Sequence, residues 1–329
     1  MKKVVLLGGG GVFAVHTAKY FLENVDLAKL ICVGRNIPRS SAYTLDVGRN
    51  DSRYQYEQIH VVFERDRLFE LLDRERPDVI INFAALAHSS SWSKSWRYYD
   101  TNVTTLAWMC EEFMKRDYLE RFLHVGTSEL YGHTDAPATE DAPLRPTSPY
   151  AVSKMAGDLH LESLWNVYRF PMNIIRPSNA FGPGQQLHRV LPRAVLCGLT
   201  GQKLPLEGGG RTRRSFIHAT DLASALHLIC ERAPLGRIYN AGPRDPISVY
   251  DLVNIVANQL RMTMEELCEV VDARKGEDVQ YWLDSTLISK DLGWEPRISL
   301  EDGAADMIAW GRKYVELIKD DSTAFILHA

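Results

Sequence analysis

The chain begins with a short apolar run, a block of glycines and a helical pattern, and this order restricts its fold more than any other feature. Residues 4–7 are apolar, Gly8 to Gly11 follow, and a helical pattern extends from Phe13 to Leu22. Glycines let a backbone approach a pyrophosphate, which the helix amino terminus then stabilises. A plain tight turn would explain the glycines alone, but further alternating strand and helix patterns follow. We therefore expect an α/β fold with a doubly wound parallel sheet that binds a nucleotide at this turn.

The bulk composition excludes several classes of partner. The 329 residues carry a formal charge of −4, which is no basic footprint for nucleic acid or a membrane surface. The apolar run at the amino terminus stops at Gly8, too early for a signal peptide, and no segment approaches the length of a membrane span. The five cysteines are scattered without metal-ligand spacing, as in reduced thiols of a cytosolic protein. We expect a cytoplasmic protein without a metal site.

The stretch between Thr127 and Lys154 contains the groups best suited to chemistry. A strand-like run, 122–125, precedes Thr127-Ser128-Glu129, and a helical pattern from 151 to 168 follows Tyr150. Tyr150 and Lys154 are four residues apart and fall on one helix face. A free phenol titrates near ~10, and a neighbouring ammonium favours its phenolate. A buried helix can hold such a pair by accident, but hydroxyl and carboxylate groups at a strand's carboxyl end favour an active site.

These motifs resemble the extended short-chain dehydrogenase/reductases, and within them the nucleotide-sugar 4,6-dehydratases. The resemblance covers nearly the whole chain, from the glycine turn to Asp291-Leu292-Gly293-Trp294. It implies a Rossmann-type domain of residues 1–178 with 216–242, and a smaller α/β substrate domain of residues 179–215 and 243–329. It also implies a homodimer that pairs through the helices after Asn102 and Tyr150.

The resemblance identifies a nicotinamide dinucleotide as the cofactor. Relatives with NAD usually carry an acidic residue near the end of the second strand, but none occurs between Lys29 and Ser41. Arg35 and Arg39 are present instead, and an arginine accepts a 2′-phosphate, so we favour NADP with NAD as the alternative. The alternative is that both arginines are solvated in a loop and bind nothing. The residues assigned to the cofactor are Gly8, Gly11, Val12, Phe13, Arg35, Ala84, Ala85, Tyr150 and Lys154, with Asn102 supporting the active-site helix.

The substrate implied by the resemblance is a nucleotide-diphosphate sugar. Asn179 lies in a segment, 176–184, that resembles a strand end of the dehydratases, and Arg214 matches an arginine that grips the diphosphate. The alternatives to substrate binding are a turn that closes the strand at Asn179 and a solvated charge at Arg214. Trp92 and Trp96 fit a pocket wall and an interface or core equally well. The residues assigned to the substrate are His88, Asn179, Val190, Arg214 and Arg274.

The reaction implied is a dehydration without net redox change, and the residues assigned to catalysis are Thr127, Ser128, Glu129, Tyr150 and Lys154. Tyr150 removes the C4 hydroxyl proton, Thr127 hydrogen-bonds the same oxygen, and Lys154 stabilises the phenolate. Glu129 then removes the C5 proton. The dTDP-glucose enzymes have Asp at the position of Ser128, and serine is a poor proton donor, so Glu129 would serve as base and then acid.

Three alternatives to dehydration remain. UDP-glucuronate decarboxylases share the Thr-Ser-Glu triplet, whereas sugar 4-epimerases usually lack a carboxylate at the position of Glu129. A dinucleotide sensor without catalysis would have no need of Tyr150, Lys154 and Glu129 together.

Overall fold

The computed structural model describes residues 2–38, 40–86, 94–272 and 280–323. Within this part of the chain, seven parallel strands form one sheet in the order β11–β6–β5–β4–β1–β2–β3. The predicted doubly wound α/β fold is confirmed. In chain order the strands are β1 (Lys2–Leu7), β2 (Leu27–Gly34), β3 (Tyr54–Gln58), β4 (Val79–Asn82), β5 (Arg121–Val125), β6 (Met172–Pro177) and β11 (Ile238–Ala241).

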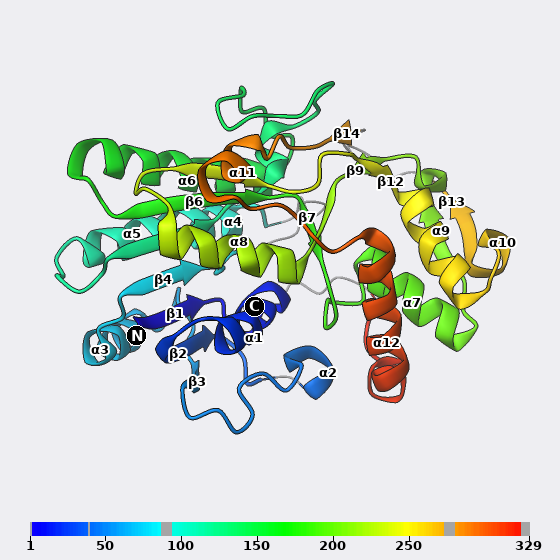
Figure 1. The fold of residues 1–329 in the computed structure, drawn as a ribbon, viewed down its shortest axis with the longest axis horizontal. Coiled ribbons are helices and arrows are strands. Elements are labelled where there is room, and N and C mark those ends of the chain that lie inside the picture. The colour runs from blue at the N-terminus through cyan, green and yellow to red at the C-terminus, as the bar shows by residue number, and fades with distance from the viewer. Residues whose placement is uncertain (1, 39, 87–93, 273–279, 324–329) are drawn as a thin grey trace.

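Helices cover both faces of this sheet because its central strands are apolar on both sides (Figure 1). In β1, Val4 and Leu6 pack toward one layer of helices, and Val5 and Leu7 pack toward the other. The first layer contains α1 (Val12–Asn24), α8 (Ala219–Arg232) and α11 (Thr286–Leu292). The second contains α3 (Arg65–Glu75), α5 (Thr105–Phe113) and α6 (Pro149–Tyr168).

The helix expected after Asn102 begins before that residue. A short helix α4 (Trp96–Tyr99) runs through one π-helical turn, η1 (Asp100–Thr104), into α5, and the residues at both junctions have right-handed helical backbone angles. Single π-helical turns inside α-helices often occur at functional sites. Asn102 lies in this turn and is buried.

A second apolar core lies at one end of the molecule (Figure 1). It is formed by α7 (Val190–Thr200), β8 (Leu204–Glu207), α9 (Val249–Leu260), α10 (Met264–Leu267), β13 (Cys268–Val271) and α12 (Leu300–Ile318). The short helix α2 (Ser41–Thr44) also docks here, since Trp310 Nε1 donates a hydrogen bond to Ala42 O at 2.7 Å. These elements form the smaller unit of the structure.

The packing of α11 differs from the predicted assignment of residues 243–329 to the substrate domain. Ile288, Leu292 and Trp294 pack into the core formed by α1, α8 and the main sheet. Trp294 Nε1 also donates a hydrogen bond to Ser224 Oγ of α8 at 2.9 Å. The apolar side chains of 286–294 therefore belong to the larger unit, and the other predicted boundaries stay predictions.

Short segments connect the two units at the carboxyl ends of the main strands. They are β7 (Asn179–Phe181) paired with β10 (Phe216–His218), β9 (Arg213–Arg214) paired with β12 (Ile247–Ser248) and β14 (Gln280–Tyr281), and the 3₁₀ turns η2 (Ser128–Tyr131) and η3 (Gly208–Gly210). In the described ranges, no helix has both the length and the apolar character to cross a membrane.

Candidate active site

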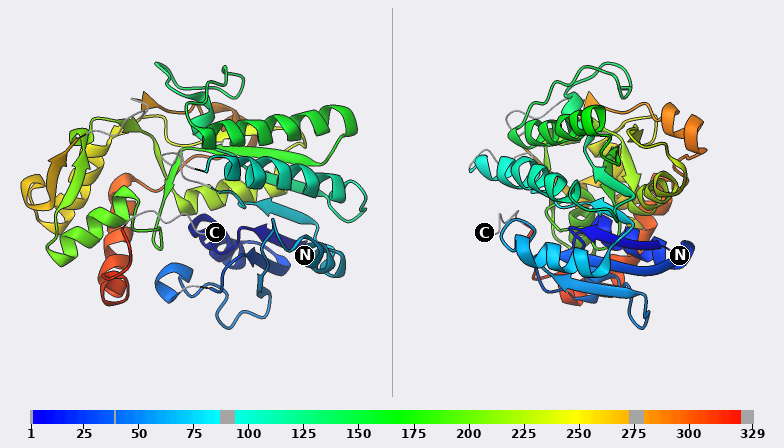
Figure 2. Two further views of the ribbon diagram at one scale, coloured as in Figure 1. Left: turned by 180° about the vertical axis from the view of Figure 1, so that it is seen from behind. Right: turned by 90° about the vertical axis from the view of Figure 1, so that its left-hand side faces the viewer.

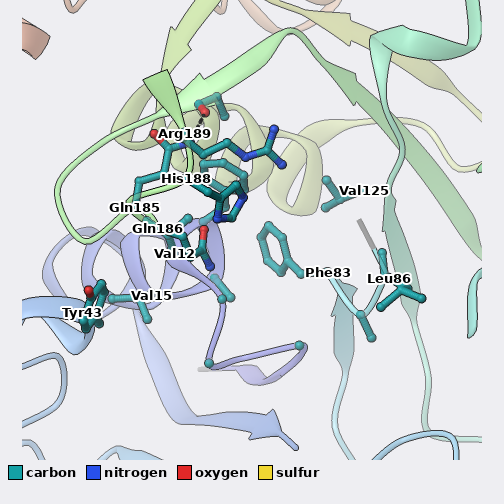
Figure 3. A pocket seen from close by; sticks show the side chains of 18 of the residues that line it. Val12, Val15, Tyr43, Phe83, Leu86, Val125, Gln185, Gln186, His188 and Arg189 are labelled. Atoms are coloured by element: carbon teal, nitrogen blue, oxygen red, sulfur yellow. Dashed lines mark hydrogen bonds between the residues drawn. The ribbon is translucent and has the colours of Figure 1, made fainter. Parts of the chain in front are cut away.

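A cavity of about 1540 Å³ lies between the carboxyl ends of the main strands and the smaller unit. Its wall begins at the glycine turn after β1, continues past the ends of β4 and β5, and reaches β8 and α7. Figure 3 shows Gln185, His188 and Arg189 on one side of this cavity, with Phe83 and Leu86 on the other. The cavity therefore connects the predicted cofactor turn to the predicted substrate segments.

The glycine turn has the close approach that a dinucleotide requires. Gly8 has φ +80°, and a Cβ there would lie 2.8 Å from the backbone N of Ala84. A Cβ on Gly9 would lie 2.6 Å from Cys32 Cβ. Gly11 is the N-cap of α1 and donates a backbone hydrogen bond to Gly8 O at 2.9 Å. The turn therefore presents bare backbone at a helix amino terminus, which fits a pyrophosphate.

Strand β2 ends at Gly34, and this position has no room for a side chain. A Cβ on Gly34 would collide with the hydroxyl of Tyr56, which donates a hydrogen bond to Asn36 O at 2.7 Å. The exposed side chain of Arg35 follows directly and lines the cavity. The pKa of His60 is lowered by its burial and further by the charges of Arg35 and Arg97. The charge of Glu64 acts on His60 in the opposite direction.

The segment after β5 brings Thr127 and Glu129 to the cavity. Thr127 is the N-cap of η2, and its Oγ1 accepts a hydrogen bond from Glu129 N at 3.3 Å. Both residues line the cavity. Ser128, predicted as catalytic, is only 1% exposed and is not among the described residues of the wall. The 3₁₀ turn therefore buries Ser128, while Thr127 and Glu129 on either side of it face the cavity.

Helix α6 presents Tyr150 and Lys154 to the same cavity. Ser148 caps the helix by accepting a hydrogen bond from Ala151 N at 3.1 Å, and Pro149 occupies the first turn, where its missing N–H costs nothing. The ring of Tyr150 packs edge-on against Tyr98, with centroids 6.1 Å apart. Tyr150 and Lys154 are both buried and both line the wall. Their predicted placement on one helix face is confirmed.

Two groups of β5 contact the amine of Lys154 and fix its position against the sheet. Its Nζ donates to Val125 O at 2.7 Å and lies 2.9 Å from His124 Nε2. Burial lowers the pKa of Lys154 to about 8, although the nearby Asp158 acts in the opposite direction. Burial and the charge of Lys154 lower the pKa of His124 well below its usual range. Sequence reasoning did not identify His124.

A buried ion pair behind Lys154 was also missed. Arg176 Nε donates to Asp158 Oδ2 at 2.9 Å, and Arg176 Nη1 donates to Tyr131 Oη at 2.9 Å. Burial raises the pKa of Asp158, and the charges of Arg176 and Lys154 oppose that shift. A signal for the pair was present in the sequence, because Arg176 is a charged residue within an otherwise uncharged run that forms a fully buried strand.

Asn102 supports the site from behind. Its Oδ1 accepts a hydrogen bond from Leu86 N at 2.9 Å, and its Nδ2 donates to Leu86 O at 3.1 Å and to Ser153 Oγ at 2.9 Å. Asn102 thus fastens α6 to the segment that contains Ala84 and Ala85, which line the cavity. Asn102 itself is not among the described residues of the wall, which agrees with a supporting role rather than contact with a cofactor.

Three of the five predicted substrate residues line the cavity, namely Asn179, Val190 and Arg214. Arg214 is largely buried, and its Nη1 donates to Arg213 O at 2.9 Å. The predictions at Arg39, His88, Trp92 and Arg274 lie outside the described residues. The wall also contains five polar residues before and within α7 that sequence reasoning missed: Gln185, Gln186, His188, Arg189 and Arg193.

Relatives of known name include proteins that match most of this chain over most of their own length, and two of them serve as examples. They are the dTDP-D-glucose 4,6-dehydratase of Bos taurus, 29% identical over 95% of this chain and 89% of that protein, and the low-salt glycan biosynthesis protein Agl12 of Haloferax volcanii, 31% identical over 91% and 95%. The trifunctional UDP-glucose 4,6-dehydratase/UDP-4-keto-6-deoxy-D-glucose 3,5-epimerase/UDP-4-keto-L-rhamnose-reductase RHM2 of Arabidopsis thaliana is 27% identical over 99% of this chain. The chain spans about half the length of that relative.

Solved structures show the same fold. The dTDP-glucose 4,6-dehydratase of Bacillus anthracis in complex with NAD superimposes with a TM-score of 0.87 at 26% identity, covering 96% of this chain and 98% of that one. The family model described as the NAD dependent epimerase/dehydratase family matches residues 4–242, from β1 through β11. The match includes the glycine turn, Thr127, Glu129, Tyr150 and Lys154, so the chain belongs to the NAD dependent epimerase/dehydratase family.

Proposed function

We propose that the protein is an NDP-hexose 4,6-dehydratase, which converts its substrate to an NDP-4-keto-6-deoxy-sugar and water. The observation that carries this proposal is the convergence of Thr127, Glu129, Tyr150 and Lys154 on the cavity that begins at the glycine turn. The relatives described above as 4,6-dehydratases support the reaction class. A carboxylate beside the tyrosine is what separates this reaction from simple oxidation at C4.

The glycine turn would hold the pyrophosphate of a nicotinamide dinucleotide, and a bound nicotinamide would accept the C4 hydride and later return it to C6. NADP fits the second-strand end better than NAD. Gly34 leaves no carboxylate for a ribose 2′-hydroxyl, and Arg35 and Arg97 place two guanidinium groups near His60. Guanidinium groups suit a 2′-phosphate. A Bacillus anthracis relative contains NAD, so measured affinities for both dinucleotides would decide this point.

The chain's own residues divide the work as follows. Tyr150 accepts the proton of the C4 hydroxyl while Thr127 hydrogen-bonds the same oxygen. The resulting 4-ketone makes the C5 proton acidic, and Glu129 removes it. The C6 hydroxyl then leaves with a proton as water, and C5 of the resulting C5–C6 double bond would regain a proton when the hydride returns to C6. Asn179 and Arg214 would contact the substrate on the other side of the cavity, where the guanidinium of Arg214 suits a diphosphate.

Glu129 would supply both proton transfers of the elimination. Ser128 is buried away from the cavity wall, so Glu129 is the acid–base group that η2 brings there. A carboxylate that first takes the C5 proton is then protonated and can donate to the departing C6 hydroxyl. We therefore expect Ser128→Ala to keep most of the activity.

The direct test is incubation with dTDP-glucose, UDP-glucose and GDP-mannose, followed by the alkaline absorbance of a 4-keto sugar. Product should form without added cofactor once the dinucleotide is bound, because the reaction is redox-neutral. Loss of CO₂ from UDP-glucuronate, or interconversion of 4-epimers without loss of water, would replace the proposal with decarboxylation or epimerisation.

The variant Glu129→Gln should separate oxidation at C4 from the elimination of water. The variant should lose dehydration by about 10²–10⁴-fold, the usual contribution of a general acid–base group, while C4 oxidation still reduces bound cofactor. Glu70→Gln, at an exposed position of α3, is the matched control and should behave as the unaltered protein. Normal dehydration by Glu129→Gln would refute the role of Glu129.

We also propose a homodimer that pairs through α5 and α6, which lie side by side on the outer face of the larger unit (Figure 2). Leu159 of α6 is 46% exposed, and Val167 and Tyr168 near its end are exposed as well. Leu159→Glu would place a charge in such an interface, so sedimentation should then show monomers. Unchanged sedimentation of this variant would exclude this pairing surface.

A further inference from the structure

A buried tyrosine ends the turn that carries Glu129. Tyr131 is the last residue of η2, and only 1% of its surface is exposed. Its hydroxyl accepts a hydrogen bond from Arg176 Nη1 at 2.9 Å and donates one to Asn240 Oδ1 at 2.9 Å. The cap at Thr127 fixes the start of η2, and these two hydrogen bonds fix its end. The placement of Glu129, between the two, depends on both.

The direction of each hydrogen bond in this group is determined by its two ends. Asn240 Nδ2 donates to Ala138 O at 2.8 Å, and a carbonyl oxygen can only accept. The oxygen of the Asn240 amide therefore points at Tyr131 and accepts its hydroxyl proton, an orientation that we infer from the network. A guanidinium can only donate, so Arg176 donates to the tyrosine oxygen. Reversing the Asn240 amide would oppose two acceptors at Ala138.

The far end of this hydrogen-bonded group is fixed to the rest of the molecule. Asp284 N donates to Ala138 O at 2.8 Å, so that oxygen is held from two sides. The backbone N of Asn240, in β11, donates to Glu140 Oε1 at 2.7 Å. The loop of residues 132–147, which leads from η2 to α6, is thus attached to the main sheet. Tyr131 therefore hydrogen-bonds to an amide that is itself held in place.

The guanidinium of Arg176 joins η2 to the helix that carries Tyr150. Its Nε donates to Asp158 Oδ2 of α6 at 2.9 Å, and its Nη1 donates to Tyr131 of η2. A guanidinium is planar and rigid, so the angle between these two hydrogen bonds is fixed. The elimination requires Tyr150 at C4 of the sugar and Glu129 at the neighbouring C5. The contacts of Arg176 hold the two elements that supply these groups.

We propose that Tyr131 is a positioning residue that places Glu129 relative to Tyr150, and that it serves the elimination of water rather than the oxidation at C4. Tyr131 is not among the described residues of the cavity wall, so it acts through η2. The oxidation uses Tyr150 and Lys154, and Lys154 is held by Val125 O without Tyr131. The inference rests on the proposed dehydratase function.

The surroundings of Tyr131 keep its hydroxyl in the neutral form that the arrangement needs. A phenolate could not donate to Asn240 Oδ1. Burial raises the pKa of Tyr131, and the charge of Arg176 opposes that shift. Two carboxylates already face this guanidinium, since Asp158 Oδ2 lies 2.9 Å from its Nε and Glu162 Oε1 lies 3.6 Å from its Nη2. Arg176 therefore does not require a phenolate as its counter-ion.

The first test measures the turn without any substrate. Tyr131→Phe removes the hydroxyl and keeps the ring. Two amides report on η2 and the loop that follows it, because Gly132 N donates to Glu129 O and Arg145 N donates to Leu130 O. In hydrogen exchange read by mass spectrometry, we expect both to exchange about tenfold faster, with α6 unchanged, as for the loss of one hydrogen bond. Unchanged exchange in η2 would overturn the proposal.

The second test separates the two chemical steps. In Tyr131→Phe the elimination should slow by about tenfold, because a small misplacement of a reacting group is costly. KM for the nucleotide sugar and the rate at which bound cofactor is first reduced should change little, so reduced nicotinamide should accumulate during turnover. Equal slowing of both steps would refute a specific role in elimination. If the unaltered protein dehydrates no sugar, the dehydratase function fails, and the exchange test still decides whether Tyr131 holds η2.

Two further variants complete the experiment. Tyr118→Phe is the matched control, because it removes a hydroxyl that donates to Asp73 Oδ1 at 2.9 Å, before the amino end of β5. It should match the unaltered protein in both tests. Asn240→Asp still accepts from Tyr131 but cannot donate to Ala138 O, so it should also slow elimination selectively, even if Tyr131→Phe fails to fold. Results for both variants that coincide with the control would exclude the positioning role.

Discussion

Replacing Arg176 by methionine should destabilise the protein strongly. The guanidinium donates to Asp158 Oδ2, Tyr131 Oη and Glu140 O, and Arg176 is only 1% exposed. Methionine fills much of the volume but leaves the Asp158 carboxylate buried without its counter-ion. Removing one partner of a buried ion pair costs roughly 3–5 kcal/mol, so we expect a loss of that size in the free energy of unfolding.

The cost of Arg176→Met should also depend on pH. Burial already raises the pKa of Asp158, and without Arg176 the pKa of this carboxyl rises further. A carboxyl whose pKa is higher in the folded state stabilises the fold below its unfolded pKa of about 3.9, and this stability is lost as the pH rises through the folded pKa. The variant should therefore lose least stability, relative to the unaltered protein, in acid and most at pH 8.

Urea unfolding of Arg176→Met at pH 5 and pH 8 measures this dependence. The double variant Asp158→Asn, Arg176→Met removes the stranded charge and should recover more than about 1 kcal/mol at pH 8, as expected for two residues in direct contact. A cost that is equal at both pH values, together with no recovery in the double variant, would refute the assignment of a buried charge pair.

Three further predictions address other parts of the site. Gly8→Ala should weaken dinucleotide binding at least about tenfold in calorimetry, because the new Cβ meets the backbone of Ala84 at 2.8 Å and φ is +80°. Asn102→Ala should lower the free energy of unfolding by about 2–4 kcal/mol in urea, since it strands a buried N–H and a buried C=O. Burial lowers the pKa of both His16 and His218 to about 4, so the unfolded chain binds more protons between pH 6.5 and 4. The free energy of unfolding should therefore fall as the pH drops through this window. In a pH series of unfolding curves, His16→Gln should show a smaller fall than the unaltered protein.

The features that sequence reasoning predicted correctly depend on short spacings along the chain. The four-residue spacing of Tyr150 and Lys154 places both on one face of α6, because residues four apart are neighbours on a helix. Thr127 and Glu129 follow a buried parallel strand, so they reach the sheet edge where the cavity lies. The glycine turn is likewise local, since φ +80° at Gly8 is a property of one residue.

The features that were missed depend on contacts between distant residues. His124 lies in a buried strand, and its partners Asn82 and Lys154 are 42 and 30 residues away along the chain. Ser128 was assigned to the site through the resemblance of the Thr-Ser-Glu triplet to the dehydratases, but the 3₁₀ turn from Ser128 to Tyr131 buries it. The family resemblance placed the segment of α11 in the substrate domain, whereas the apolar side chains of Ile288 and Leu292 pack it into the larger unit.

The ion pair of Asp158 and Arg176 gives α6 a fixed register against the sheet. Tyr150, Lys154 and Asp158 follow one another at four-residue intervals, so one face of α6 presents all three. Asp158 pairs with Arg176 of β6, and Lys154 donates a hydrogen bond to Val125 O of β5. A rotation of the helix by one residue would break both contacts and strand two charges in the interior, at a cost of several kcal/mol. The same contacts therefore hold Tyr150 toward the cavity, which explains why charged groups are retained in a core where apolar side chains would pack as well.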